Sequence, residues 1–208
     1  MNAPAKPGID GRRLRSERTR QLIVEAYIAI VRETGQAPTA AQVAERAGYS
    51  VRSVFERFPD LETLRLAVVD LALSEGRSDA ALQALGRDRA TRLRLQVEAR
   101  AQNRERWLPL WRVMVGQAEV SEGMVARIEK IREMSMQRIE AVFARELAAA
   151  ADEGERRMAL IAIEALTEFE SWDRLRFTFG LSFEEGCSCW LEAIDRLLPA
   201  TPPASAVS

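Results

Sequence analysis

The segment from Thr39 to Phe58 has the clearest pattern of apolar and polar positions in the chain, and this pattern predicts two short helices joined by a tight turn. Gly48 stands where the chain must leave the first helix, which is a common position for glycine. Thr39 can cap the first helix, and Ser50 is a residue type that favours the N-cap of the following helix. The side chains expected to face the core are Ala41, Val43, Ala44 and Ala47 in the first helix, and Val51, Val54, Phe55 and Phe58 in the second.

The second of these helices keeps polar residues on its other face, namely Arg52, Ser53, Glu56 and Arg57. A helix-turn-helix that binds DNA has this arrangement, because its turn holds the second helix so that a polar face enters the major groove. The pattern therefore predicts a DNA-reading element near the start of the chain.

The rest of the sequence has helical periodicity and no alternating pattern typical of strands, so we expect an all-α fold. Pro59 and Asp60 end the second short helix, and Asp60 is expected to cap the next one. We expect the basic residues of the segment 89–104 to be spread over its surface. The expected helices outside the helix-turn-helix are 14–34, 61–73, 89–104, 107–117, 121–151, 153–177 and 183–198, the last of them capped by Ser182.

Charge is distributed unevenly along the 208 residues, although the formal net charge is only -1. Residues 1–58 carry 10 basic and 6 acidic side chains, whereas residues 59–208 carry 20 and 25. A basic head on an acidic body is what a DNA reader with a separate regulatory domain would have.

Composition argues against an enzyme. The chain has no histidine, which excludes His-based triads and most zinc sites, and we expect neither a metal nor a cofactor. It also lacks a glycine-rich phosphate loop and a nucleophile elbow. Cys187 and Cys189 are poorly placed for an intrahelical disulfide and are expected to be ordinary buried thiols, with a redox sensor as the alternative. Met1 to Gly11 lacks the apolar core of a signal peptide, and no apolar run is long enough for a membrane span, so we expect a cytoplasmic protein.

The stretch from Arg12 to about Val69 resembles the DNA-binding domain of the TetR/AcrR family of bacterial transcriptional regulators. The resemblance is carried, in order and without gaps, by the basic lead-in from Arg12 to Arg20, Gly35, Thr39-Ala40, Val43-Ala44, Ala47-Gly48-Tyr49-Ser50, Phe55-Glu56-Arg57-Phe58 and Leu61-Glu62-Thr63-Leu64. It implies a three-helix, homeodomain-like DNA-binding domain at 12–60, a linker helix at 61–73, and a helical regulatory domain at 74–200 that binds a ligand and dimerises.

The resemblance also implies which residues contact DNA. Arg52 and Ser53 are the best candidates for base edges, and Val51 is a candidate for a thymine methyl. Phe55 replaces a tyrosine of the family, whose hydroxyl bond to phosphate is therefore absent, and Leu61 replaces a lysine, so the charge is lost although the backbone N–H groups at the helix N-terminus can still bind a phosphate. The full set of expected DNA-binding residues is Arg12, Arg13, Arg15, Thr39, Arg46, Tyr49, Ser50, Val51, Arg52, Ser53, Phe55 and Arg57.

In the regulatory domain, large apolar side chains are candidates for a ligand cavity, with ordinary core packing as the alternative for each. They are Trp107, Trp111, Met114, Met134, Phe143, Trp172 and Phe177. The resemblance implies that the last two helices pair with those of a second copy, through Ala162, Leu166, Phe169, Trp190 and Ile194.

The sequence is best interpreted as a homodimeric repressor that a small, largely apolar effector releases from a palindromic operator. The alternative is a helical protein of the same fold that binds small molecules and has lost strong DNA binding, which the residues at Phe55 and Leu61 would suit.

Overall fold

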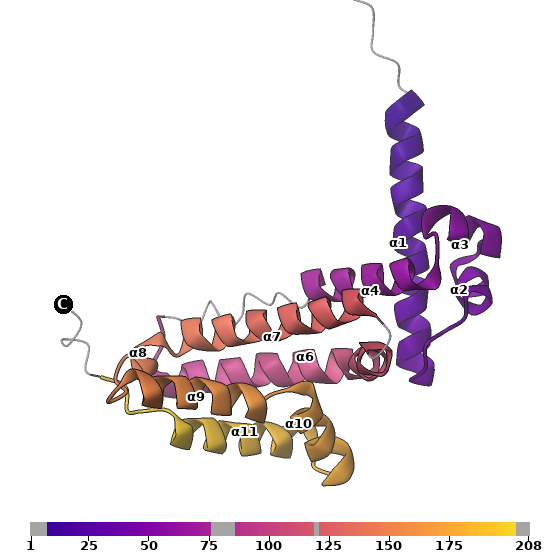
Figure 1. Ribbon diagram of the computed structural model, residues 1–208. Helices are drawn as coiled ribbons and strands as arrows, with labels where there is room; N and C mark the ends of the chain where they lie inside the picture. Colours follow the sequence, from indigo (N-terminus) through magenta and orange to yellow (C-terminus); the bar gives the residue numbers. More distant parts are fainter. Residues whose placement is uncertain (1–7, 76–85, 119–120, 203–208) are drawn as a thin grey trace, which may run out of the picture. The chain divides into compact units, whose positions relative to one another are not determined.

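The computed structural model describes residues 8–75, 86–118 and 121–202. These residues form helices and no strand, so the predicted all-α class is confirmed for the described part of the chain (Figure 1). They divide into two compact units. The first unit takes its described residues from Met1–Ser74 and Pro109–Val125, and the second from Glu75–Leu108 and Ala126–Ser208.

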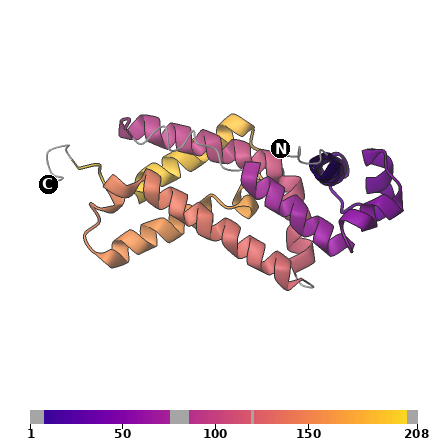
Figure 2. The ribbon, with the colours of Figure 1, turned by 90° about the horizontal axis from the view of Figure 1, so that it is seen from above.

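The first unit begins with α1 (Gly8–Thr34), followed by α2 (Ala40–Ala47), α3 (Val51–Arg57) and α4 (Leu61–Glu75). Ile23, Tyr27 and Val31, four residues apart on α1, are fully buried and form the apolar stripe of this helix. In Figures 1 and 2, α2 and α3 lie beside α1, which is seen nearly end-on in the second view. The helix starts earlier than the predicted residue 14.

The ends of the short helices are capped as the sequence predicts. Thr39 and Gln42 form a capping box at the start of α2, and Gly48 ends that helix with a left-handed φ of 75°. The Ser50 hydroxyl accepts a hydrogen bond from the Ser53 N–H (3.1 Å), and Asp60 accepts one from the Thr63 N–H (2.6 Å). These local bonds stabilise the first turns of α3 and α4.

The second unit contains the first part of α6 (Arg89–Ala118), most of α7 (Glu122–Val142), α8 (Ala144–Leu147), α9 (Glu153–Leu166), α10 (Phe169–Asp173), the π-helical segment η1 (Arg174–Thr178) and α11 (Phe183–Leu197). Three predicted helix boundaries were wrong. Pro109 lies inside α6 between the buried residues Leu108 and Leu110, and the helix continues through it although proline lacks the N–H. The expected helix 121–151 breaks at Phe143, and the expected helix 153–177 breaks at Thr167.

Aromatic packing joins α10 to α11 in the second unit. The rings of Trp172 and Trp190, both fully buried, lie 4.7 Å apart between centroids, and Phe183 meets Trp172 edge-on at 5.6 Å. Gly186 permits this approach, because a Cβ there would lie 2.8 Å from the Trp172 ring. α9 and α11 pack side by side in the same unit (Figure 1).

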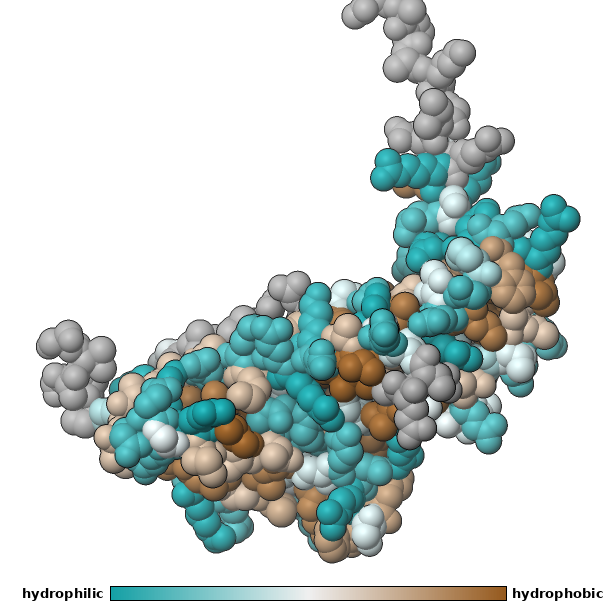
Figure 3. Space-filling model, in the orientation of Figure 1, coloured by the Kyte–Doolittle hydropathy of each residue, from teal (hydrophilic) through white to brown (hydrophobic). Residues whose placement is uncertain are grey.

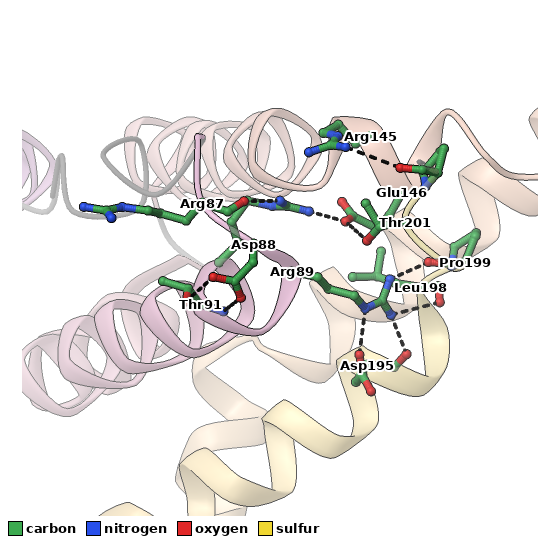
Figure 4. Close-up of polar contacts among 12 residues, drawn as sticks. Arg87, Asp88, Arg89, Thr91, Arg145, Glu146, Asp195, Leu198, Pro199 and Thr201 are labelled. Atoms are coloured by element: carbon green, nitrogen blue, oxygen red, sulfur yellow. Dashed lines mark hydrogen bonds and ion pairs between the residues drawn. The ribbon is translucent and has the colours of Figure 1, made fainter. Parts of the chain in front are cut away.

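The C-terminal segment is fastened to the start of α6 by polar contacts (Figure 4). Arg89 donates from Nε to Asp195 Oδ1 and from Nη2 to the Asp195 carbonyl, both at 2.9 Å, and also bonds the Leu198 and Pro199 carbonyls. Beside it, Arg92 and Glu146 form a buried ion pair, and the Thr201 hydroxyl donates to the same carboxylate. Residues far apart in sequence thus close one end of this unit.

Candidate DNA interface and regulatory core

The outward face of α3 is more apolar than the sequence suggests. Val54 and Phe58 are buried as predicted, but Val51 and Phe55 are 40% and 42% exposed, so placing these two in the core was wrong. A seven-residue helix can bury only one narrow stripe, and the pair Val54 and Phe58 fills it. Figure 3 shows the resulting hydrophobic surface over α3. Ala41, another expected core residue, is also exposed.

Arg52 is the most accessible cation of α3, with 89% of its side chain exposed. Its Nε donates to Glu56 Oε1 at 3.2 Å, one turn further along the helix. An exposed pair of this kind contributes at most about 1 kcal/mol, so the guanidinium can exchange its partner for an acceptor on DNA. Ser53 is half-buried, and its Oγ lies 2.9 Å from Ser50 Oγ.

Arg20 of α1 fixes the end of α3. Its Nη1 donates to the Arg57 carbonyl at 2.8 Å, and its guanidinium lies 4.1 Å from the centroid of the Phe58 ring. These contacts hold α3 at its C-terminus, while Arg57 itself keeps 31% of its side chain exposed. The turn adds a weaker contact, because the Thr19 hydroxyl donates to Tyr49 Oη at 3.4 Å.

The remaining cations of the predicted interface differ in their exposure and in their ion pairs. Arg46 forms a two-bond ion pair with Glu33 of α1, which holds the pKa of Glu33 below its ordinary value through the hydrogen bond. Arg13 and Arg15 are exposed on α1. Arg12 belongs to the same helix, but its side chain lies outside the described part of the structure. Thr39 is exposed at its cap position.

The apolar candidates for a ligand cavity are mostly interior residues. Trp107, Phe143 and Trp172 are buried in the second unit, where Trp172 Nε1 donates to Glu105 Oε2 at 2.6 Å, and Met134 is half-buried there. Trp111 and Met114 are buried in the first unit. Phe177 does not fit the prediction, because η1 turns its side chain outward and leaves it 65% exposed.

The residues predicted for dimerisation are divided between interior and surface. Phe169, Trp190 and Ile194 are buried within the chain itself, so they have almost no surface left for a partner. Ala162 and Leu166 are half-buried on α9. Met158 and Ile161 are large apolar side chains exposed on the same helix, which the sequence reasoning missed. The helical spacing of the apolar residues of α9 does not distinguish its inner from its outer face.

Polar side chains on α6 form a feature that the sequence reasoning placed wrongly on the surface. Arg100 and Arg104 are 7% and 5% exposed, and their Nε atoms donate to the same acceptor, the Thr167 carbonyl, at 3.3 and 3.0 Å. Burial lowers the pKa of Arg104 to about 10 and that of Arg100 well below its ordinary value. Repetition of polar residues every four positions, from Arg92 to Arg104, was the available signal.

Glu164 also departs from its ordinary ionisation. Burial, followed by its hydrogen bond with Glu168 and the charge of that residue, raises the pKa of Glu164 to about 7.

The free thiols differ from each other: Cys189 is exposed, against prediction, whereas burial raises the pKa of the half-buried Cys187 to about 11. Among the described residues, no cluster of ligand side chains suits a metal ion, and no helix is long and apolar enough to cross a membrane.

No protein-family model matches the sequence, and no curated protein matches it significantly. Solved structures do match, over most of both chains. A protein of Rhodococcus sp. described as a TetR-family transcriptional regulator is 21% identical, with a TM-score of 0.63 over 86% of this chain and 98% of its own.

Two further structures have more specific descriptions. NalD, the secondary repressor of the MexAB-OprM multidrug efflux pump in Pseudomonas aeruginosa, is 22% identical, with a TM-score of 0.58 over 88% of this chain and 97% of its own. The multidrug binding protein EbrR, solved with imidazole, is 19% identical, with a TM-score of 0.61 over 89% and 91%. At such identities the likeness establishes the architecture, and this chain has the fold of the TetR-family transcriptional regulators.

Proposed function

We propose that this protein is a DNA-binding transcriptional regulator of the TetR family. The observation that carries the proposal is the construction of α3, which is capped by Ser50, held by Arg20 through the Arg57 carbonyl, and left with an exposed outer face. That face offers Arg52 for hydrogen bonds to bases, and Val51 and Phe55 for apolar contacts such as the thymine methyl. A single helix of this length reads few base pairs, so a homodimer on a palindromic site is expected.

We further propose that residues 12–60 bind DNA, 61–73 connect, and 74–200 bind a small-molecule effector and dimerise. NalD is described as a repressor and EbrR as a multidrug binding protein, and both descriptions favour a repressor with an effector of apolar character. In a repressor of this kind, the effector binds more tightly to the conformation that cannot bind DNA, and so lowers operator occupancy. For dimerisation, the exposed Met158 and Ile161 on α9 are better candidates than the buried Trp190.

A second function, small-molecule binding without DNA recognition, is favoured by one observation. Glu33 forms a two-bond ion pair with Arg46, one of the interface arginines. Phe55 and Leu61 also lack the hydroxyl and the charge that a tyrosine and a lysine would offer to phosphate.

Selection of binding sites from random duplex DNA, at near-physiological salt, tests the proposal. We expect an enriched palindromic motif, whose binding weakens steeply with salt and survives competitor DNA. Absence of enrichment, both for protein as purified and after unfolding and refolding to remove any retained effector, would favour the second function.

A further inference from the structure

Polar side chains recur every fourth residue on the buried face of α6, within the second unit. Arg92, Gln96, Arg100 and Arg104 are 1%, 2%, 7% and 5% exposed. Four residues of an α-helix advance about 6 Å and slightly more than one turn, so these side chains form one row that winds slowly around the helix. Burying polar groups costs free energy unless they find partners, so each member of the row needs an acceptor.

The first member of the row has a charged partner inside the protein. Arg92 forms an ion pair with Glu146, and the two side chains are 2% and 0% exposed. The Thr201 hydroxyl donates to the same carboxylate, as Figure 4 shows. The fold can therefore neutralise a buried arginine on this helix.

Arg100 and Arg104 lack such a partner among the described residues. Arg100 donates to the Thr167 carbonyl and to Ser135 Oγ, and Arg104 donates to the same carbonyl and to Asn103 Oδ1 at 3.1 Å. All of these acceptors are neutral. One turn before Arg100, Nε2 of Gln96 is buried with no hydrogen-bond partner in the described structure.

The nearest carboxyl groups compensate for these charges only in part. Glu164 and Glu168 attract both arginines, and Glu170 attracts Arg104, but burial and the neighbouring Glu168 raise the pKa of Glu164 to about 7, so this carboxyl carries less than a full negative charge near neutral pH. Arg138 of α7 adds a third positive charge that acts on both arginines. Among the described residues, no carboxylate forms an ion pair with Arg100 or Arg104, and the cluster keeps one buried donor, Gln96 Nε2, and one buried acceptor, Glu164 Oε1, without a hydrogen-bond partner.

We propose that Arg100 and Arg104 bind the carboxylate of a small organic acid, and that this acid is the effector. The effector role rests on the function proposed above. A carboxylate matches the guanidinium fork in shape and charge, and it can accept hydrogen bonds from both arginines. Gln96 supplies a neutral donor one turn away, and the Phe169 ring, 4.2 Å from the Arg104 guanidinium, holds that group in place.

A purely structural role would make different predictions. Thr167 is the C-cap residue of α9, and cations near a helix C-terminus stabilise its last carbonyls. If capping were the only role of the two arginines, anions would leave the stability of the protein unchanged.

The test uses the full chain and straight-chain acids from acetate to octanoate, together with benzoate, each beside its neutral primary amide. At about 100 times its dissociation constant, the preferred acid should raise the melting temperature by about 5 to 10 °C, and its amide should not. Arg104→Gln and Arg100→Gln should each weaken binding of that acid about 10- to 100-fold. Arg94→Gln is the matched control, because Arg94 is exposed on the same helix.

Two outcomes would overturn the site: no acid in the series stabilises the protein more than its amide, or the preferred acid binds Arg104→Gln as tightly as it binds the Arg94→Gln control. If Arg100→Gln fails to fold, Arg104→Gln alone decides between these outcomes.

DNA binding is measured separately on the selected operator. An acid that binds through the arginines but leaves operator affinity unchanged would overturn the effector role and keep the site. A protein that selects no operator but binds the acid would instead contradict the regulator function.

Discussion

Among the described residues, both units contain exposed ion pairs, but only the second contains a buried one. In the first unit, Arg52 and Glu56 pair with 89% and 50% of their side chains exposed. In the second, Arg92 and Glu146 pair in the interior, almost without contact with water. Water screens an exposed pair and permits its partners to change, whereas a buried pair is bound to one geometry. Exposed pairs suit a surface that binds DNA, because their side chains can change partners. A buried pair suits a helical bundle with one fixed packing.

Removal of a buried partner should have the largest effect. Glu146→Ala leaves the Arg92 charge uncompensated in the core and should lower the free energy of unfolding by about 3–5 kcal/mol. Glu192→Ala removes the exposed partner of Arg196 and should cost less than about 1 kcal/mol. Urea denaturation measures both.

The double variant Arg92→Met, Glu146→Leu separates charge from packing, because it removes both charges at once. It should recover most of the stability lost in Glu146→Ala. A loss in Glu146→Ala no larger than that in Glu192→Ala would contradict the contrast between buried and exposed pairs.

The exposed pair should matter for DNA and little for stability. Arg52→Ala should reduce discrimination between the operator and mismatched sites by about 1–3 kcal/mol, because an arginine fork reads guanine through two hydrogen bonds. Competition binding with operator and random duplexes measures this, and Lys130→Ala, an exposed change on α7, is the control. An equal loss on both duplexes would instead assign Arg52 to a phosphate.

A helix cap should have an intermediate effect on stability. Ser50→Ala removes the hydroxyl that accepts from the Ser53 N–H and should cost about 1 kcal/mol of stability. Ser188→Ala, in the interior of α11, removes a hydroxyl that bonds only the Glu184 carbonyl of its own helix and should change stability by about 0.5 kcal/mol or less. Equal effects in thermal unfolding would show that the cap is not what starts α3.

The sequence predicted the helix-turn-helix well because its signals are local. Thr39, Gly48, Ser50 and Asp60 act on neighbours within a few residues, and the structure has all four in their predicted roles. The buried row on α6 could not be predicted in this way. Whether Arg104 faces water or the core depends on the Thr167 carbonyl, which is 63 residues away along the chain.

The spacing of apolar residues also did not determine which face of a helix is buried. Val51 and Phe55 repeat with the same period as Val54 and Phe58, and only packing against α1 decides which pair is buried. The same ambiguity put Trp190 in an interface, although it fills the core between α10 and α11.

The last prediction concerns the pH dependence of the second unit. The pKa of Glu164 is about 7 in the folded protein, against an ordinary value of 4.5. Between these two pH values the unfolded chain releases this proton while the folded chain keeps it, so the contribution of Glu164 to stability falls as pH rises through this window and is level above it. Glu164→Gln has no such proton and should become progressively more stable relative to wild type from pH 4.5 to 7.

Urea midpoints across this range measure the difference, with Glu129→Gln, an exposed change on α7, as the control. Parallel curves for wild type and Glu164→Gln would mean that this carboxyl is ionised normally, and that it neutralises the buried arginines more fully than the geometry indicates.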